Sequence, residues 1–342
     1  MATWWNTKYR YRKQITITAP AGKTVPVGYP INLAEDQDAL ETAGRLLANR
    51  NDWRIVYWGG SSWTDLPRQI ISDTQTMFGA QAAVSAGTTN TDHYLYYGNA
   101  SEATSKVPTS EADWNDIYVP HSIASTLYLV HCKEGTSTAL ADTDSGGATN
   151  LTLVGGGWVT SSNKFGYAVN LAGAVGQYIS VPSLDIDAFT FECFLKRDNI
   201  SAGGESLVDQ AIDTLKWNAG FNAKDLIVNM WGQSGSNSGT WTNFTPDTNW
   251  HHVAISFDGS VNATAYLDGV SKGAKALNGG GQIIMRAGAS TATIGKSLDG
   301  RISNIRLRNV ATSSFDYAFT DSVGTSTGEE VAGSTGAFLN IL

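Results

Sequence analysis

The chain has 342 residues, of which 42% are hydrophobic and 16% charged, and its net charge is −8. This composition is typical of a folded protein, and the length predicts two domains because single cores rarely grow this large. Lys and Arg gather only at Lys8–Lys13, which we interpret as a solvated strand face, so no nucleic-acid partner is expected. No apolar run reaches the roughly 18 residues of a membrane span, so no membrane partner is expected. The N-terminus also lacks the apolar segment of a secretory signal.

The first hundred residues read as short strands separated by turns. Residues 9–18 alternate and end before Pro20, and residues 53–58 and 93–97 are rich in aromatic and β-branched side chains. One helix is predicted over residues 36–49, because leucines and alanine recur there at spacings of three and four. We therefore predict a β-rich first domain with a single helix.

Composition also predicts where the domains begin and end. Residues 106–124 are rich in Ser, Thr, Ala and Pro, so we expect a first domain over 1–105, a linker, and a second domain over 125–312. The many short strands of the second domain, with turns between them, predict a two-sheet sandwich. Residues 313–342 form a Gly/Ser/Thr-rich tail, which we expect to dock on a partner by strand addition. That partner would be another copy of this chain or another virion protein, and a cell-surface glycan is a further possible partner of the protein.

The stretch Trp250–Gly269 anchors the second domain. Val253, Ile255 and Phe257 alternate with small residues, which predicts a half-buried strand. An Asp-Gly pair breaks the run at residues 258–259, and a second alternating run ends at another Asp-Gly pair. Two strands joined by such a turn predict an antiparallel hairpin.

This hairpin resembles the W-H-H-V-A…D-G…Y-x-D-G motif of laminin-G-like domains of the concanavalin A lectin and glucanase superfamily. Further matching pieces follow in the same order and cover roughly residues 125–311. They are residues 165–169 (FGYAV), 178–182 (YISVP), 189–192 (FTFE), 294–296 (IGK) and 299–306 (DGRISNIR). The resemblance implies a jelly-roll sandwich for the second domain. It does not fix a function, because one fold hosts many functions.

The first half resembles a domain of unknown function found on bacterial, archaeal and phage surface proteins, often ahead of laminin-G-like domains. The matching pieces are residues 11–17 (YRKQITI), 52–57 (DWRIVY), 65–68 (DLPR) and 94–100 (YLYYGNA). This resemblance implies an architecture and a surface setting, and it carries no known chemistry. Together the two halves predict an all-β protein with two β-sandwich-type domains in series.

The sequence does not predict an enzyme. Hydrolases of the resembled superfamily carry catalytic acids at alternate positions of one strand, in a Glu-x-Asp-x-Glu pattern that is absent here. Asp185-Ile186-Asp187 is the nearest match, but it stands in a predicted turn. His251 and His252 are adjacent, so their side chains should point to opposite faces of a strand and cannot share a small site. We expect one packed and one surface histidine.

No cofactor is expected, although a structural calcium ion is an alternative that the resemblance implies. Many relatives hold Ca²⁺ with an acidic residue near the first strand and another in a late strand. Here Ser303 and Asn304 replace the late acids, which argues against an ion that prefers several carboxylate oxygens. The remaining candidate ligands are Asp142, Asp144 and Asp299.

A carbohydrate site is the binding function that we expect of this domain. Sugar sites combine aromatic faces with amide and carboxylate hydrogen bonds, and the segment 231–241 offers two tryptophans flanking polar residues. The alternative is that these tryptophans pack in the core. The candidate residues are Trp217, Asn229, Trp231, Gln233, Asn237 and Trp241.

Two hypotheses about the whole protein follow. The first is a non-enzymatic virion component, such as a capsid decoration, tail or fibre protein, which would be assembled in the host cytoplasm. The second is a polysaccharide-binding or adhesion module of a bacterial cell-surface or secreted protein. Cys132 and Cys193 fall in predicted strands, where two buried thiols are expected and a disulfide stays open.

Overall fold

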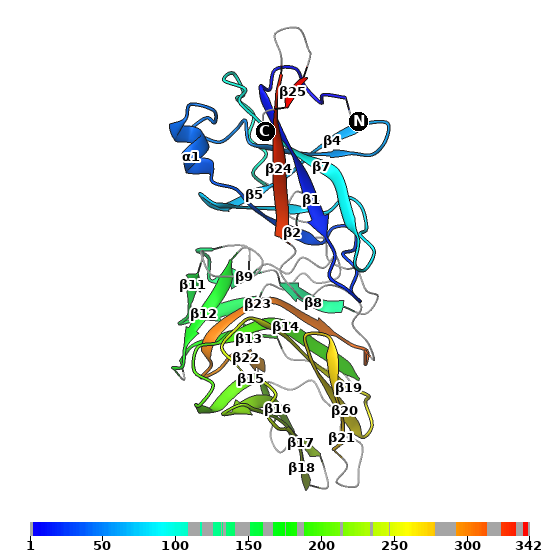
Figure 1. Ribbon diagram of the computed structural model, residues 1–342. Helices are drawn as coiled ribbons and strands as arrows, with labels where there is room; N and C mark the ends of the chain where they lie inside the picture. Colours follow the sequence, from blue (N-terminus) through cyan, green and yellow to red (C-terminus); the bar gives the residue numbers. More distant parts are fainter. Residues whose placement is uncertain are drawn as a thin grey trace. The chain divides into compact units, whose positions relative to one another are not determined.

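In the computed structural model the chain forms two compact units (Figure 1). The first comprises Met1–His121 with Asp316–Leu342, and the second comprises Ser122–Phe315. The structure describes residues 3–108, 117, 126–130, 132, 135–140, 151–159, 167–174, 176–182, 188–212, 215–232, 235–245, 247–277, 292–312, 323–332 and 338–340. The chain therefore completes most of the first unit, builds the second, and returns to the first with its last segment.

The first unit is one nine-stranded sheet with the strand order β4-β3-β7-β1-β24-β2-β6-β5, and β25 pairs with β24. The strands are β1 (Tyr11–Thr18), β2 (Pro30–Ala34), β3 (Arg54–Trp58), β4 (Trp63–Leu66), β5 (Gln69–Ser72), β6 (Gln75–Gly79), β7 (Thr89–Tyr97), β24 (Val323–Ala332) and β25 (Phe338–Asn340). The predicted all-β fold is confirmed, although this unit builds one continuous sheet rather than two stacked sheets.

Different side chains bury the two faces of this sheet. Ile15 and Ile17 are fully buried at alternate positions of β1, whereas Tyr94 and Tyr96 of β7 belong to an aromatic cluster. The guanidinium of Arg12 lies 5.2 Å from the ring centroid of Tyr94 and is also held over Trp4. The expectation of a solvated strand face is therefore wrong for Arg12, because aromatic residues cover it. The cluster comprises Trp4, Trp5, Tyr9, Val56, Trp58, Trp63, Tyr94 and Tyr96.

The predicted helix is shorter than residues 36–49. α1 spans Gln37–Thr42, and the side chain of Asp36 caps it by accepting a hydrogen bond from the Ala39 backbone N–H at 2.9 Å. The helix ends because Gly44 adopts a left-handed φ of 65°, a conformation that glycine accepts just beyond a helix end. Leu46 lies beyond the end of the helix and is still buried. The helical spacing of apolar residues therefore continues past the last residue of α1.

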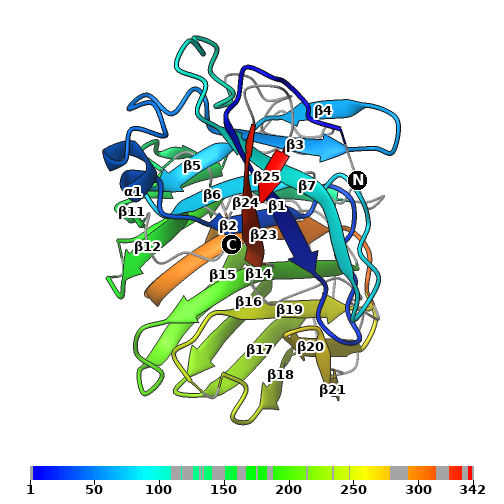
Figure 2. The ribbon, with the colours of Figure 1, turned by 45° about the horizontal axis from the view of Figure 1, so that its top comes forward.

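The tail returns to its own chain. β24 pairs antiparallel with β1, from Tyr11↔Val331 to Ile17↔Gly324, and parallel with β2 (Figure 2). Glu330 accepts a hydrogen bond from Arg12 Nε at 2.6 Å. For this strand the prediction that the tail docks on a partner is wrong, because β1 and β2 satisfy its backbone groups within one chain.

The second unit stacks two sheets. One has the order β18-β17-β16-β15-β22-β13-β10-β9, and the other has the order β11-β12-β23-β14-β19-β20-β21, with β8 pairing with β23. In the first sheet the strands are β9 (Ala139–Leu140), β10 (Leu151–Val154), β13 (Tyr178–Val181), β15 (Gly203–Ile212), β16 (Leu215–Asn222), β17 (Asp225–Gly232), β18 (Gly235–Trp241) and β22 (Ala292–Ile294). In the second they are β8 (Thr126–Val130), β11 (Gly157–Val159), β12 (Ala168–Ala172), β14 (Phe189–Arg197), β19 (His251–Phe257), β20 (Asn262–Leu267), β21 (Val270–Ala276) and β23 (Asp299–Arg308). The predicted two-sheet sandwich is confirmed.

The predicted hairpin lies in the second of these sheets. β19 pairs with β20 in register from Val253↔Leu267 to Phe257↔Ala263, and it pairs with β14 on its other side. Its alternate residues Val253, Ile255 and Phe257 belong to the core between the sheets. Cys132 and Cys193 are buried in the same core and are not joined by a disulfide.

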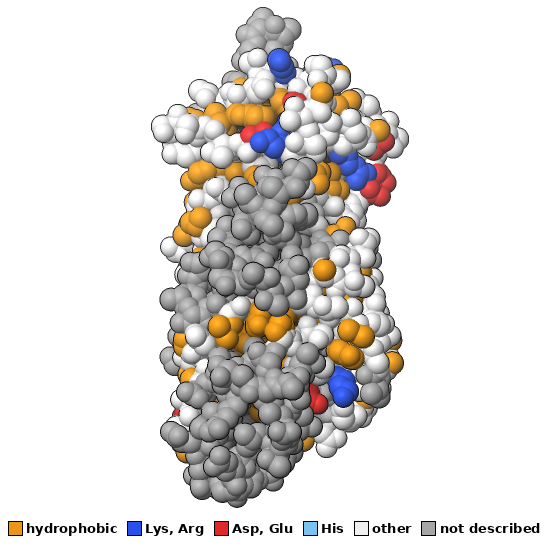
Figure 3. Space-filling model, turned by 180° about the vertical axis from the view of Figure 1, so that it is seen from behind, with side chains coloured by type: hydrophobic (Ala, Val, Ile, Leu, Met, Phe, Trp, Pro, Cys, Tyr) orange, Lys and Arg blue, Asp and Glu red, His pale blue; other side chains and the backbone are white. Residues whose placement is uncertain are grey.

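Charged side chains are sparse on the drawn surface (Figure 3), as the 16% of charged residues in the sequence leads one to expect. On the face drawn in Figure 3, the coloured Lys and Arg side chains lie singly or in small groups. Among the described helices, none is long and apolar enough to cross a membrane.

Candidate functional site

One face of the second unit carries polar side chains in register. In the sheet that contains β15 to β18, which we call the polar-faced sheet, alternate residues enter the core and the others point outward. On β16, Trp217, Ala219 and Phe221 are buried in the core, whereas Asn218 and Asn222 lie on the opposite face. The sequence Trp-Asn-Ala-Gly-Phe-Asn therefore makes one apolar and one polar face from a single strand.

The polar face continues from strand to strand, because neighbouring strands place outward residues opposite one another. Seven such residues form a line that we call the polar row. Each of the strands β10, β13, β22, β15, β16, β17 and β18, which neighbour one another in that order, contributes one of them. Its residues pair in the order Thr152↔Ser180, Ser180↔Thr293, Thr293↔Asp209, Asp209↔Asn218, Asn218↔Asn229 and Asn229↔Ser238.

An open hollow of about 310 Å³ lies beside the polar row on β15, β16 and β17. Gly220 deepens it, since a Cβ there would lie 2.4 Å from the Glu205 backbone oxygen. No larger residue fits that position without moving the backbone. The hollow is lined by Gly204, Glu205, Ser206, Asn218, Gly220, Phe221, Asn222, Ile227 and Asn229.

Two amides meet at the junction of the hollow and the polar row. Asn229 Nδ2 donates a hydrogen bond to Asn218 Oδ1 at 2.9 Å, and both side chains are half-buried. Each amide has two donor hydrogens and one acceptor oxygen, so this bond leaves Asn218 Nδ2 and Asn229 Oδ1 able to bond a ligand. The pair can therefore donate to one hydroxyl and accept from another.

A buried ion pair supports the wall of the hollow. Arg197 Nε donates to Glu205 Oε2 at 2.6 Å, and the two residues are 1% and 3% exposed. Arg197 also donates to the Ala223 carbonyl and to Thr245 Oγ1, while Glu205 Oε1 accepts from the Asp299 backbone N–H at 3.1 Å. Burial raises the pKa of Glu205 and lowers that of Arg197, although each partner favours the charged form of the other.

The structure separates the predicted sugar-binding residues. Trp217 and Trp241 are core residues, each 3% exposed, and their indole N–H groups donate to Gln210 Oε1 and the Gly273 carbonyl. Their prediction as stacking faces is therefore wrong, because strand alternation turns both rings inward. Asn229 does lie on the polar face. Gln233 and the side chains of Trp231 and Asn237 lie outside the described residues.

Residues 231–241 belong mainly to a hairpin, in which β17 ends at Gly232 and β18 begins at Gly235. Sequence reasoning missed Asn218, Asn222 and Ser206. Their signal was the alternation of polar and apolar residues along β16, which predicts that the polar set faces outward.

The adjacent histidines are separated as predicted. His251 is hydrogen-bonded to Asp268 Oδ2 at 2.8 Å and Asp247 Oδ1 at 3.0 Å, and these bonds, led by Asp268, raise its pKa. His252 is buried on the other side of β19, 2.9 Å from Glu192 Oε2, and burial lowers its pKa. The two rings therefore belong to different structural networks.

The calcium candidates do not gain a site from the described residues. Within this part of the chain, no group of three His, Cys, Asp or Glu residues is arranged to hold a metal ion. Asp142 and Asp144 lie outside the described residues, and Asp299 stands at the start of β23. A bound calcium ion thus stays a prediction from the resemblance.

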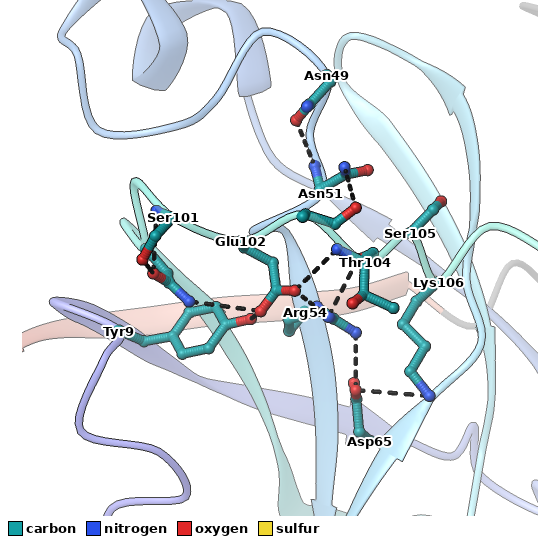
Figure 4. Close-up of polar contacts among 12 residues, drawn as sticks. Tyr9, Asn49, Asn51, Arg54, Asp65, Ser101, Glu102, Thr104, Ser105 and Lys106 are labelled. Carbon is teal, nitrogen blue, oxygen red and sulfur yellow. Dashed lines mark hydrogen bonds and ion pairs between the residues drawn. The ribbon is translucent and has the colours of Figure 1, made fainter.

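A second polar cluster lies in the first unit (Figure 4). Arg54 Nη1 contacts Asp65 Oδ2 at 2.7 Å, Arg54 Nη2 lies 3.2 Å from Glu102 Oε1, and Tyr9 OH donates to Glu102 Oε2 at 2.8 Å. Arg54 also donates to the Thr104 carbonyl. These bonds hold residues 102–106 against the sheet, so we assign a structural role to the cluster.

Comparisons with known proteins agree with the fold of the second unit. Residues 172–315 match the family described as the concanavalin A-like lectin/glucanases superfamily. No curated protein matches this sequence. The C-terminal part of the chain is therefore a concanavalin A-like domain.

Similar solved structures are distant. The binding domain of Paraclostridial Mosquitocidal Protein 1 is 16% identical with a TM-score of 0.44, and the match covers 55% of this chain and 50% of that one. Domain 4 of AbnA, a GH43 extracellular arabinanase from Geobacillus stearothermophilus, solved with arabinotriose, is 16% identical with a TM-score of 0.44, covering 55% and 94%. The botulinum neurotoxin serotype D binding domain is 12% identical with a TM-score of 0.43, covering 55% and 49%. The chain thus spans about half the length of the first and third of these structures.

Proposed function

We propose that this protein is a non-enzymatic carbohydrate-binding protein whose second unit binds glycans at the hollow on the polar-faced sheet. The single observation that carries the proposal is this hollow of about 310 Å³, with Asn218, Asn222, Asn229 and Ser206 in its lining. Its volume is at the lower end of the range for small-ligand sites. The family name that the domain matches, which joins lectins with glucanases, also supports a carbohydrate ligand.

The chemistry of the lining suits a sugar. A sugar hydroxyl both donates and accepts hydrogen bonds, and the side chains of Asn and Ser do the same. Ile227, which is half-buried, adds apolar surface beside these groups, against which the C–H face of a sugar ring can pack. No Lys or Arg is among the described residues that line the hollow, so phosphate or sulfate is a poorer fit.

The carboxylate in the hollow does not suit catalysis. Glycoside hydrolysis needs two carboxyl groups, about 5 to 10 Å apart, that are free to act on the scissile bond. Among the described residues that line the hollow, Glu205 is the one carboxylate, and both its oxygens are engaged, by Arg197 and by the Asp299 backbone. A carboxylate held in this way supports the wall and cannot serve as a mobile acid or base.

Two settings are compatible with this activity. The sequence predicts a virion component, and its alternative is a module of a bacterial cell-surface or secreted protein. One support for the virion setting, a tail that docks on a neighbouring protein, is lost because β24 pairs within its own chain. We therefore place glycan recognition first, and the virion or cell-surface setting stays a prediction that the neighbouring genes would test.

The test is binding of the full chain to polysaccharides by affinity electrophoresis and titration calorimetry. We expect binding to at least one neutral polysaccharide, and we expect the N218A/N229A double variant to weaken it. Each lost hydrogen bond is worth roughly 0.5–1.5 kcal/mol, so the double variant should bind about 5- to 150-fold more weakly if the two losses add.

A matched control separates a local effect from a general one. Asn170 is half-buried on β12, in the other sheet of the same unit, and N170A should leave the affinity unchanged. Equal binding by the wild type and N218A/N229A would refute the proposed site. Release of reducing sugar from the bound polysaccharide would refute the non-enzymatic assignment.

A further inference from the structure

We propose that β24 is a closing strand that couples the two units, so that the first sheet closes readily only when the second unit has folded. This coupling does not depend on what the second unit binds. The observation that carries the inference is the order of the chain, because the second unit is built between Lys106 and β24. The first sheet therefore receives this strand only after the chain has passed through the second unit.

The closing strand joins two parts of the first sheet. In the described strand order it stands between β1 and β2, so without it the order divides into β4-β3-β7-β1 and β2-β6-β5. The strands β1 and β2 would then each expose a row of backbone N–H and C=O groups, which is a template for pairing with other chains. Release of β24 thus converts a closed sheet into two open edges.

Polar contacts hold the closing strand in place. None of the β24 side chains that the structure describes is fully buried. Glu330 accepts a hydrogen bond from Arg12 Nε at 2.6 Å, and Glu329 accepts one from Arg45 Nη1 at 2.8 Å. Elements with few buried apolar contacts open at a low free energy. The cost of closing the loop before β24 therefore has a strong influence on how often the strand is released.

The segment that leaves the first unit is fixed to it up to Lys106 (Figure 4). Glu102 Oε1 lies 3.2 Å from Arg54 Nη2, and the Lys106 carbonyl accepts a hydrogen bond from the Arg68 backbone N–H at 3.0 Å. Insertion of β24, which begins at Val323, therefore closes a loop that starts at Lys106. This loop is about 217 residues long, and closing it has an entropic cost that grows with its length.

Folding of the second unit shortens this loop. Its strand β8 pairs with β23, and Thr126 stands opposite Arg308. Residues paired in this way lie about 5 Å apart, so the folded unit replaces all the chain between them by one short step. About 20 residues then lead from Lys106 to Thr126 and about 15 from Arg308 to Val323, which makes an effective loop of about 35 residues.

The size of the coupling follows from these two lengths. The free-energy cost of closing a loop of n residues rises as (3/2)RT ln n. A reduction from about 217 to about 35 residues therefore favours insertion of β24 by about 15-fold. Linkage requires the same factor in the other direction, so an inserted β24 favours folding of the second unit to the same extent.

The experiment is hydrogen–deuterium exchange of the full chain, read in peptides that cover β1 and β24, with I255D as the variant. Ile255 is fully buried in the core of the second unit, so a carboxylate there should unfold this unit, and loss of protection in β14 and β19 verifies that it does. Where the exchange rate reports the opening equilibrium, we expect β24 to exchange about 15-fold faster in I255D than in the wild type. V270D is the matched control, because Val270 is 59% exposed on β21 of the same unit, and it should leave β24 unchanged.

Insertions test the loop length while both units stay folded. A Gly/Ser segment of about 35 residues between Phe315 and Asp316 doubles the effective loop, and one of about 70 residues triples it, so β24 should exchange about threefold and about fivefold faster. The control carries the shorter segment between Gly59 and Gly60, two exposed residues between β3 and β4. It lengthens the chain without lengthening the loop, and β24 should exchange as in the wild type.

Three results would overturn the coupling. The first is equal exchange of β24 in I255D and the wild type when the peptides of β14 and β19 show that the second unit is unfolded. The second is exchange of β24 that does not change with the length inserted between Phe315 and Asp316, which decides the matter if I255D fails to fold as a whole. The third is an equally large effect of the insertion between Gly59 and Gly60.

Discussion

The buried pair of Arg197 and Glu205 gives the sharpest prediction about stability. In E205A the guanidinium of Arg197, only 1% exposed, would lose its carboxylate partner. Removing one partner of a buried pair typically costs about 3–5 kcal/mol, because the remaining charge stays buried without compensation. Arg197 keeps its bonds to the Ala223 carbonyl at 2.6 Å and to Thr245 Oγ1 at 2.9 Å, so we expect a loss near the lower end, about 3 kcal/mol.

The assay is equilibrium urea unfolding, followed by tryptophan fluorescence and circular dichroism. D198A is the matched control, because Asp198 pairs with Arg301 at 2.9 Å but the two side chains are 35% and 22% exposed. An exposed pair of this kind contributes about 1 kcal/mol or less. The double variant R197M/E205L removes both charges, and it should recover most of the stability lost in E205A.

Two results would refute the reasoning. If E205A lost less free energy of unfolding than D198A, the pair could not be a buried support of the hollow. If R197M/E205L were as unstable as E205A, the loss would come from altered packing around β15 and not from the uncompensated charge.

Three further predictions concern pH and the closing strand. Hydrogen bonds to Asp268 and Asp247 raise the pKa of His251, so its stabilising effect is complete below about pH 6.5 and is lost as the pH rises through the higher folded-state value. The stability difference between the wild type and H251Q should accordingly shrink from pH 6 to pH 9 in thermal scans, and a constant difference would contradict this. Burial lowers the pKa of His93 to about 4. The wild type should therefore lose stability relative to H93Q as the pH falls from about 6.5 to about 4. An equal loss of stability in the wild type and in H93Q would contradict this. A chain ending at residue 315 lacks β24, so limited proteolysis should degrade the first unit and spare the second, and survival of both would show that β24 is dispensable.

Local patterns in the sequence predicted much of the second unit. The alternation of Val253, Ile255 and Phe257 and the Asp-Gly turn predicted β19 and β20, because both the strand period and the turn chemistry are local properties. The separation of His251 and His252 followed from the same period. These features depend on neighbours in the chain, so the sequence contains them directly.

The closing strand β24 could not be predicted in this way. Its sequence, VGTSTGEEVA, has no apolar alternation, and its stabilising partners lie far away in the chain. Glu330 pairs with Arg12, which is 318 residues earlier, and Arg45 Nη1 donates to Glu329 Oε1 at 2.8 Å. Such long-range ion pairs and backbone pairing leave no periodic signal, so the sequence predicted a tail that docks on a partner and not a strand of the first unit.

The sequence predicted only part of the candidate site, and the prediction failed for the tryptophans for a physical reason. The sequence leaves two interpretations of the tryptophans open, sugar-stacking faces or core residues, and Trp217 and Trp241 follow the second. They occupy core-facing positions whose neighbours, such as Asn218, face outward. Aromatic residues contribute large buried areas to a core, and strand alternation decides which face receives them. The hollow itself depends on Gly220 and on the approach of the β15 backbone, a distance that sequence spacing does not contain.

The location of the bound glycan tests the central claim most directly, and hydrogen–deuterium exchange of the full chain with and without its best-binding neutral polysaccharide measures it. The account predicts slower exchange in peptides covering β15 to β18 and β22, with the N218A/N229A variant losing that protection. Protection confined to the first unit, or to the opposite sheet of the second, would contradict the account.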